Sequence, residues 1–236
     1  RILASDIGGT SSRFADFELS AGGLTKRNVV WLKTDGARSL GDLLAALPAN
    51  GFNLTALAAD LAVFAIAGPI EEGVFSKPPN IDWSVDLRSL GEFVALNRSV
   101  LINDFLAQAF APLSEVGTRA LLILEGSASA RGTIAVIGAG TGLGKAFLVP
   151  DGRGGFVGAP SEGGHANFAP ETAREQEFAN FLTTRFAAPF AEWEFVVSGP
   201  GLSALHEFLS GESLSPKDVA AKFATAPETL AWFARF

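Results

Sequence analysis

The feature that most constrains the fold is a pair of glycine-rich turns, each preceded by a short apolar run typical of a strand. The first turn, DIGGT at 6–10, follows ILAS, and the second, GAGTGLG at 138–144, follows TIAVI. Strand-forming residues resume at 13–19 and at 145–149. Each region therefore predicts a strand, a glycine turn and an antiparallel strand, and together they form a weak internal repeat.

Other segments predict an alternation of strands and helices, and hence an α/β fold. Further strands are expected at 27–32, 61–67, 100–103 and 193–197, and helices at 39–47, 86–96, 105–113, 171–186, 198–209, from 215 onward and at 227–236. We expect two domains, a smaller one at 1–113 and a larger one at 114–236. The last expected helix contains Phe233 and Phe236, which are unusual at a solvated end, so we expect the second domain to be truncated.

Composition excludes several classes of protein. With 48% hydrophobic and only 18% charged residues, the 236-residue chain can bury a large core and does not resemble a disordered protein. A net charge of −7 without a basic stripe argues against a nucleic-acid surface, and no apolar run reaches membrane-spanning length. The absence of cysteine excludes disulfides, and we expect a cytoplasmic protein. The chain also lacks methionine and tyrosine, so we expect that it is not an intact translation product.

The glycine turn at 138–144 admits several interpretations. A dinucleotide fingerprint would need glycine where Leu143 stands, and a P-loop would need glycine at Ala139 and a hydroxyl residue at Ala146. A hairpin whose N–H groups and Thr141 hydroxyl hold phosphate remains open, as does a plain tight hairpin. For DIGGT, the alternatives are an ordinary turn or a phosphate loop in which Asp6 binds Mg²⁺ through water.

Five conspicuous polar residues lie outside the turns. Asn103 and Asp104 stand between a strand end and a helix start, where they can cap the helix or accept a proton from a substrate hydroxyl. Glu162 and His165 flank two glycines, so a helical metal site is a poor fit and contacts to a polyol are the better one. Glu194 lies in an apolar segment, either on a solvated strand face or as a further ligand.

In their order along the chain, seven segments resemble bacterial glucokinases, ATP-dependent sugar kinases of the actin and hexokinase superfamily. The segments are DIGGT, AGP at 67–69, NIDW at 80–83, IND at 102–104, GAGTGLG, SEGGHANFAP at 161–170 and SGPGL at 198–202. The resemblance implies two ribonuclease-H-like α/β domains around a cleft. It also implies that family members continue beyond residue 236, into a loop that holds adenosine and a helix that returns to the first domain.

The same resemblance implies the roles of individual residues. Asp104 resembles the catalytic base, and the sugar ligands are expected to be Asn80, Asn103, Asp104, Glu162, His165 and Glu194. Nucleotide-binding residues are expected to be Asp6, Gly8, Gly9 and Thr10 in the first loop and Gly140, Thr141 and Gly142 in the second. The implied reaction is phosphorylation of the glucose 6-hydroxyl by ATP with Mg²⁺. A homodimer is compatible with it. The alternatives are a kinase for mannose or N-acetylglucosamine, a non-catalytic sugar-binding regulator, and an inactive fragment.

Overall fold

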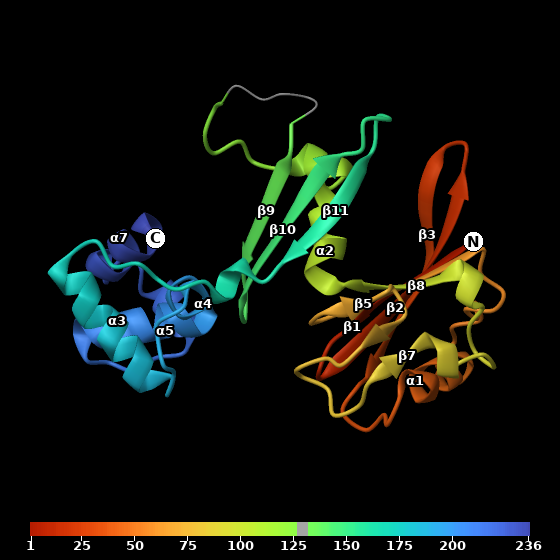
Figure 1. Ribbon diagram of the computed structural model, residues 1–236, viewed down its shortest axis with the longest axis horizontal. Helices are drawn as coiled ribbons and strands as arrows, with labels where there is room; N and C mark the ends of the chain where they lie inside the picture. Colours follow the sequence, from red (N-terminus) through yellow and green to blue (C-terminus); the bar gives the residue numbers. More distant parts are fainter. Residues whose placement is uncertain (127–131) are drawn as a thin grey trace. The chain divides into compact units, whose positions relative to one another are not determined.

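The computed structural model describes residues 1–126 and 132–236, which form two compact units, Arg1–Ala120 and Leu121–Phe236 (Figure 1). The division follows Ala120, whereas the domain boundary expected from the sequence follows residue 113. Both units combine strands with helices, as the α/β pattern predicts. Each unit has its own hydrophobic core.

A five-stranded mixed sheet forms the centre of the first unit, with strand order β3-β2-β1-β4-β8. Its strands are β1 (Ile2–Ile7), β2 (Ser11–Ser20), β3 (Gly23–Lys33), β4 (Leu61–Ile66) and β8 (Ser99–Asn103). The hairpins β1–β2 and β2–β3 are antiparallel, as the turns predict, while β1, β4 and β8 run parallel. Ile7 pairs with Ile66, and Ile66 pairs with Asn103, so three strands end at one edge.

Helix α1 and several short segments complete the first unit. They are α1 (Leu40–Ala46), α2 (Asp104–Ala109), the small sheet of β5 (Ile70–Glu71), β6 (Phe75–Ser76) and β7 (Val85–Asp86), and the 3₁₀ helices η1 (Pro48–Asn50), η2 (Leu87–Ser89), η3 (Leu96–Arg98), η4 (Ala111–Leu113) and η5 (Gly117–Arg119). Leu40, Leu43 and Leu44 of α1 join the core formed by Phe14 and Phe64 of the sheet. The Ser39 hydroxyl accepts a hydrogen bond from the Asp42 N–H and caps this helix.

The second unit begins with a three-stranded antiparallel sheet of order β11-β10-β9. Its strands are β9 (Ile134–Ala139), β10 (Leu143–Pro150) and β11 (Phe156–Ser161), followed by the 3₁₀ helix η6 (Gly163–His165). Ala139 pairs with Leu143, which leaves residues 140–142 as the hairpin turn. The predicted strand, glycine turn and strand are thus confirmed in both units.

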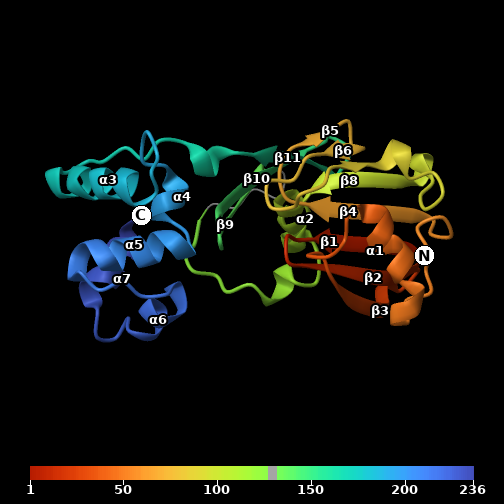
Figure 2. The ribbon, with the colours of Figure 1, turned by 90° about the horizontal axis from the view of Figure 1, so that it is seen from below.

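Five helices follow, gathered together in Figure 2. They are α3 (Ala173–Arg185), α4 (Trp193–Val196), α5 (Gly199–Ser210), α6 (Pro216–Ala221) and α7 (Pro227–Arg235). Aromatic rings fill their core, and the buried Phe178 ring contacts those of Phe208, Trp232 and Phe236. The Thr172 hydroxyl and Glu175 carboxylate form a capping box that starts α3.

Two expected elements are wrong. The helix expected at 86–96 is replaced by the short 3₁₀ helix η2 and turns, because Gly91 interrupts the segment and disfavours a continuous helix. The strand expected at 193–197 is instead the single helical turn α4. Its apolar run is too short for periodicity to distinguish helix from strand. No helix in the described part of the chain is long and apolar enough to cross a bilayer.

Candidate functional site

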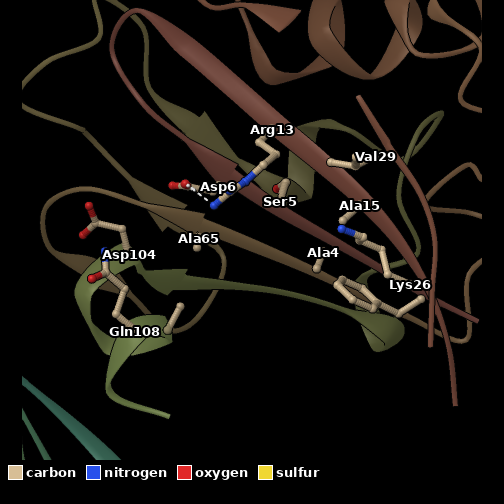
Figure 3. Close-up of a pocket in the computed structure, with 12 residues that line it drawn as sticks. Ala4, Ser5, Asp6, Arg13, Ala15, Lys26, Val29, Ala65, Asp104 and Gln108 are labelled. Atoms are coloured by element: carbon tan, nitrogen blue, oxygen red, sulfur yellow. Dashed lines mark hydrogen bonds and ion pairs between the residues drawn. The ribbon is translucent and has the colours of Figure 1, made fainter. Parts of the chain in front are cut away.

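In the first unit, the shared edge of β1, β4 and β8 brings together residues that are far apart in the sequence. Asp6 pairs with Ala65 on β4, whose next residue pairs with Asn103 at the end of β8. Asp6 and Asp104 both line a pocket of about 420 Å³, together with Arg13 and Gln108 (Figure 3). The carboxyl edge of parallel strands is where α/β sheets bind ligands.

The DIGGT turn lies at this edge and contacts Asn80. Gly8 N–H donates to the Ser11 carbonyl over 3.1 Å and closes the turn. A Cβ at Gly9 would lie 2.6 Å from the Asn80 carbonyl oxygen, so only glycine fits there without a shift of the backbone. Gly9 and Thr10 are exposed. The turn therefore presents backbone to solvent next to a predicted sugar ligand.

The Asp6 carboxylate is compatible with the predicted Mg²⁺ site. Its side chain is 54% exposed, and Arg13 Nη2 lies 3.2 Å from Oδ2. Mg²⁺ in nucleotide sites usually keeps several waters and takes one or two carboxylates, so a single accessible carboxylate is sufficient. Among residues 1–126 and 132–236, no three His, Cys, Asp or Glu side chains are grouped as a multi-ligand metal site would require.

Asn103 and Asp104 are adjacent at the start of α2, but their side chains make different contacts. Asn103 Oδ1 accepts from Leu106 N–H over 2.9 Å and caps α2, while its Nδ2 donates to the Gly68 carbonyl over 3.1 Å. Asp104 Oδ1 accepts from Phe105 N–H over 2.8 Å. Burial raises the pKa of Asp104; the Phe105 hydrogen bond opposes this, and the nearby Asp6 charge adds to it. The result is a carboxylate of increased basicity at the sheet edge.

In the second unit, Gly140, Thr141 and Gly142 form a turn that is anchored from both sides. Gly199 N–H donates to the Gly140 carbonyl over 2.8 Å, and the Glu194 carboxylate accepts from Leu143 N–H over 2.8 Å. A Cβ at Gly142 would lie 2.5 Å from Glu194 Oε2. Glycine at position 142 thus leaves room for the Glu194 carboxylate. Thr141 is exposed at the tip of the hairpin.

Glu162 precedes η6 and His165 is its last residue, and η6 packs against the start of β10. A Cβ at Gly164 would lie only 2.2 Å from the Leu143 carbonyl oxygen, and this close approach fixes η6 beside the hairpin. His165 Nε2 lies 3.9 Å from Glu162 Oε2, and its Nδ1 lies 2.7 Å from Glu192 Oε2. The hydrogen bond to Glu192 raises the pKa of His165; burial lowers it, and the charges of Glu194, Glu192 and Glu162 add to the rise.

The predicted site residues therefore form two groups, one in each unit. The first unit contains Asp6, Gly8, Gly9, Thr10, Asn80, Asn103 and Asp104, and the second contains Gly140, Thr141, Gly142, Glu162, His165 and Glu194. Sequence reasoning missed Arg13 and Glu192. Arg13 follows DIGGT closely, and its position facing Asp6 across the hairpin would have identified it. No linear pattern connects Glu192 to His165.

The chain thus combines two α/β units, and each contains a glycine turn between two antiparallel strands. A family model described as Glucokinase matches residues 3–233. The chain therefore belongs to the glucokinase family. A Synechocystis glucokinase is 31% identical over 96% of this chain and 65% of its own length, and an Aromatoleum aromaticum glucokinase is 37% identical over 87% and 60%. The chain spans between 44% and 67% of the length of such curated relatives.

Solved structures agree on the fold. Glucokinase from an Antarctic psychrotroph superposes with a TM-score of 0.73 at 27% identity, over 98% of this chain and 74% of that one. Balamuthia mandrillaris glucokinase, solved in complex with glucose, superposes with a TM-score of 0.65 at 20% identity, over 99% and 71%. The predicted two-domain α/β fold is thus confirmed.

Proposed function

We propose that this protein transfers the γ-phosphoryl group of ATP to the 6-hydroxyl of glucose. Family membership supports this reaction. The single structural observation on which the proposal rests most is the position of Asp104, at the same sheet edge and in the same pocket as Asp6 of the DIGGT turn. A base next to a phosphate loop is what transfer to a hydroxyl requires.

In the proposed reaction, Asp104 accepts the proton of the sugar hydroxyl. The hydroxyl oxygen forms its bond to the γ-phosphorus as the bond between that phosphorus and the bridging oxygen breaks, and ADP leaves. A raised pKa makes the Asp104 carboxylate a better proton acceptor at neutral pH. The DIGGT and GAGTGLG turns offer backbone N–H groups to the phosphates. Mg²⁺, held near Asp6, supplies neutralisation of phosphate charge when bound.

The candidate sugar ligands have the chemistry that a hexose requires. A neutral polyol donates hydrogen bonds through its hydroxyl groups, and the carboxylates of Glu162 and Glu194, together with Asn80 and Asn103, offer acceptors. A site that pairs each hydroxyl with a polar group rejects analogues that lack one, because the protein group is then left unpaired. Glucose itself is supported by the family match.

Asp104→Asn tests the proposal. The substitution keeps the size and the acceptor for Phe105 N–H but removes the base, so we expect turnover to fall by about 10²–10⁴-fold. Glucose binding, measured by calorimetry, should persist. A coupled ADP-release assay with glucose, mannose and N-acetylglucosamine gives the substrate preference of the unmodified protein. Turnover close to that of the unmodified protein in Asp104→Asn would refute the assignment of the base.

A further inference from the structure

Glu192 lies outside every recognised motif, yet it makes a short side-chain contact with a predicted sugar ligand. Its Oε2 lies 2.7 Å from His165 Nδ1. Because His165 belongs to the sugar site proposed above, the inference developed from this contact rests on that proposed function.

The backbone holds Glu192 in place by pairing two short segments. Asn167 and Glu192 form an isolated antiparallel β-bridge. Hydrogen bonds flank it on both sides, from Trp193 N–H to the Ala166 carbonyl over 3.0 Å and from Phe168 N–H to the Ala191 carbonyl over 2.8 Å. The Phe168 and Trp193 rings pack edge to face with centroids 5.0 Å apart. Glu192 is therefore fixed beside His165 by contacts that do not involve its own side chain.

The contact determines which imidazole nitrogen holds the proton. An ionised carboxylate can only accept, so Nδ1 must be the donor. The opposite nitrogen, Nε2, is then directed toward Glu162, at 3.9 Å from Oε2. The Glu192 side chain is 19% exposed and that of His165 is 53% exposed, so the anchored carboxylate is the more buried partner and the ring remains accessible.

The charged groups around His165 are mainly acidic. Glu192, Glu194 and Glu162 each raise the pKa of His165, while burial lowers it. Lys145 of β10 is the cation of the strand packed against η6, and its Nζ donates to the Gly163 carbonyl over 3.1 Å. Because the net shift of the His165 pKa is upward, the imidazole stays protonated to a higher pH than a free histidine, with Nε2 as a donor.

We propose that Glu192 is a positioning residue that holds the His165 ring with Nδ1 protonated and Nε2 directed at a hydroxyl group of the bound sugar. Glu192 itself does not contact the sugar. It acts by preventing the ring from turning over and by excluding the tautomer in which Nε2 alone is protonated.

Nitrogen NMR tests the pair directly, since the chain contains only two histidines. In Glu192→Gln, the amide can donate as well as accept, so both tautomers become accessible. We expect the His165 titration midpoint to move to lower pH and its Nδ1 and Nε2 shifts at high pH to indicate mixed tautomers. Glu192→Asp keeps the charge and should move the midpoint less.

Two controls separate this effect from general loss of charge. Glu177→Gln removes the same charge from an exposed pair with Arg174 and should leave the His165 signals unchanged. His206 is buried against Thr229, with Nδ1 3.0 Å from the hydroxyl, and its signals should not respond to Glu192→Gln. An unchanged titration and tautomer of His165 in Glu192→Gln would overturn the proposal.

Binding and kinetics then connect the pair to the sugar. In Glu192→Gln, we expect weaker glucose binding by calorimetry and a KM for glucose raised roughly 2- to 10-fold, the range of one lost hydrogen bond, with kcat changed less. Glu177→Gln should match the unmodified protein. If the His165 signals respond but glucose affinity does not, the positioning role is wrong although the contact exists. If the unmodified protein binds no hexose, the proposed function fails and the sugar-positioning role fails with it.

Discussion

At the scale of single residues, Asp104 illustrates the cost of partly burying a carboxylate. Its neighbour Asn103 caps α2 with its oxygen and bonds Gly68 with its nitrogen. Asp104 is thereby relieved of the capping role, and its Oδ1 accepts the Phe105 N–H. The raised pKa of Asp104 means that its charged form is less favourable in the folded chain than in the unfolded one.

This cost predicts that Asp104→Asn stabilises the fold at neutral pH. Because the folded pKa is raised, the folded chain binds this proton more tightly, so the stability contributed by Asp104 falls as pH rises from about its ordinary value of 3.8 to the higher folded value. Above that window the destabilisation is complete, and below it there is none. We expect the melting temperature of Asp104→Asn to exceed that of the unmodified protein by a few degrees at most at pH 7, with the difference shrinking toward pH 4.

Asp86→Asn is the matched control for this measurement. The side-chain hydrogen bond from Arg88 lowers the pKa of Asp86, which is the opposite direction. Its neutral replacement should therefore not raise the melting temperature at pH 7. If Asp104→Asn melted below the unmodified protein at pH 7, the inferred cost of the Asp104 charge would be wrong.

At the scale of elements, η6 is positioned by the close contact of its middle residue with β10. Gly163 and Gly164 are adjacent, but a Cβ on each would meet different neighbours. At Gly164 the nearest atom is the Leu143 carbonyl oxygen at 2.2 Å, which belongs to the backbone of the hairpin. At Gly163 the nearest atoms are side-chain atoms of Ser161 and Lys145 at 3.1 and 3.2 Å, which can move away.

We therefore expect Gly164→Ala to be much more damaging than Gly163→Ala. Forcing a methyl group against fixed backbone typically costs about 1–3 kcal/mol. At Gly164 the added methyl group would push η6 away from β10. Gly163→Ala should cost less than about 1 kcal/mol, since flexible side chains absorb it. Denaturant unfolding gives both values, and glucose calorimetry should show a larger loss for Gly164→Ala. Equal free-energy changes for the two variants would contradict this account of the turn.

The elements also show what local sequence can and cannot predict. Strands next to glycine turns were predictable, because apolar runs and glycine act on their immediate neighbours, and β1, β2, β9 and β10 follow the prediction. The segment at 193–197 was not, because its conformation depends on distant partners. Trp193 N–H donates to the carbonyl of Ala166, the residue after η6, and the Glu194 carboxylate accepts from Leu143 N–H of the hairpin. These contacts from distant segments favour the helical turn.

At the scale of the whole molecule, the candidate residues are shared between two units with separate cores. Leu3, Phe14 and Phe64 belong to the core of the first unit, and Phe178 and Leu205 to that of the second. The motif order predicts the candidate residues, but the Glu192–His165 contact joins positions with no common sequence signal. Such contacts arise only when distant segments pair, and the sequence alone does not encode them in any short pattern.

The predicted sugar ligands occur in both units, so we expect glucose to slow amide hydrogen exchange in both. A ligand that binds only the folded state stabilises the elements it contacts, by about 2.7 kcal/mol at a concentration 100-fold above Kd. We expect protection around Asn80 and Asn103 in the first unit and around Glu162 and His165 in the second. Exchange measured by mass spectrometry with saturating glucose, and with sorbitol at the same concentration as a solvent control, gives the two patterns. Protection confined to one unit would mean that the sugar ligands predicted in the other do not contact glucose, and it would remove half of the proposed site.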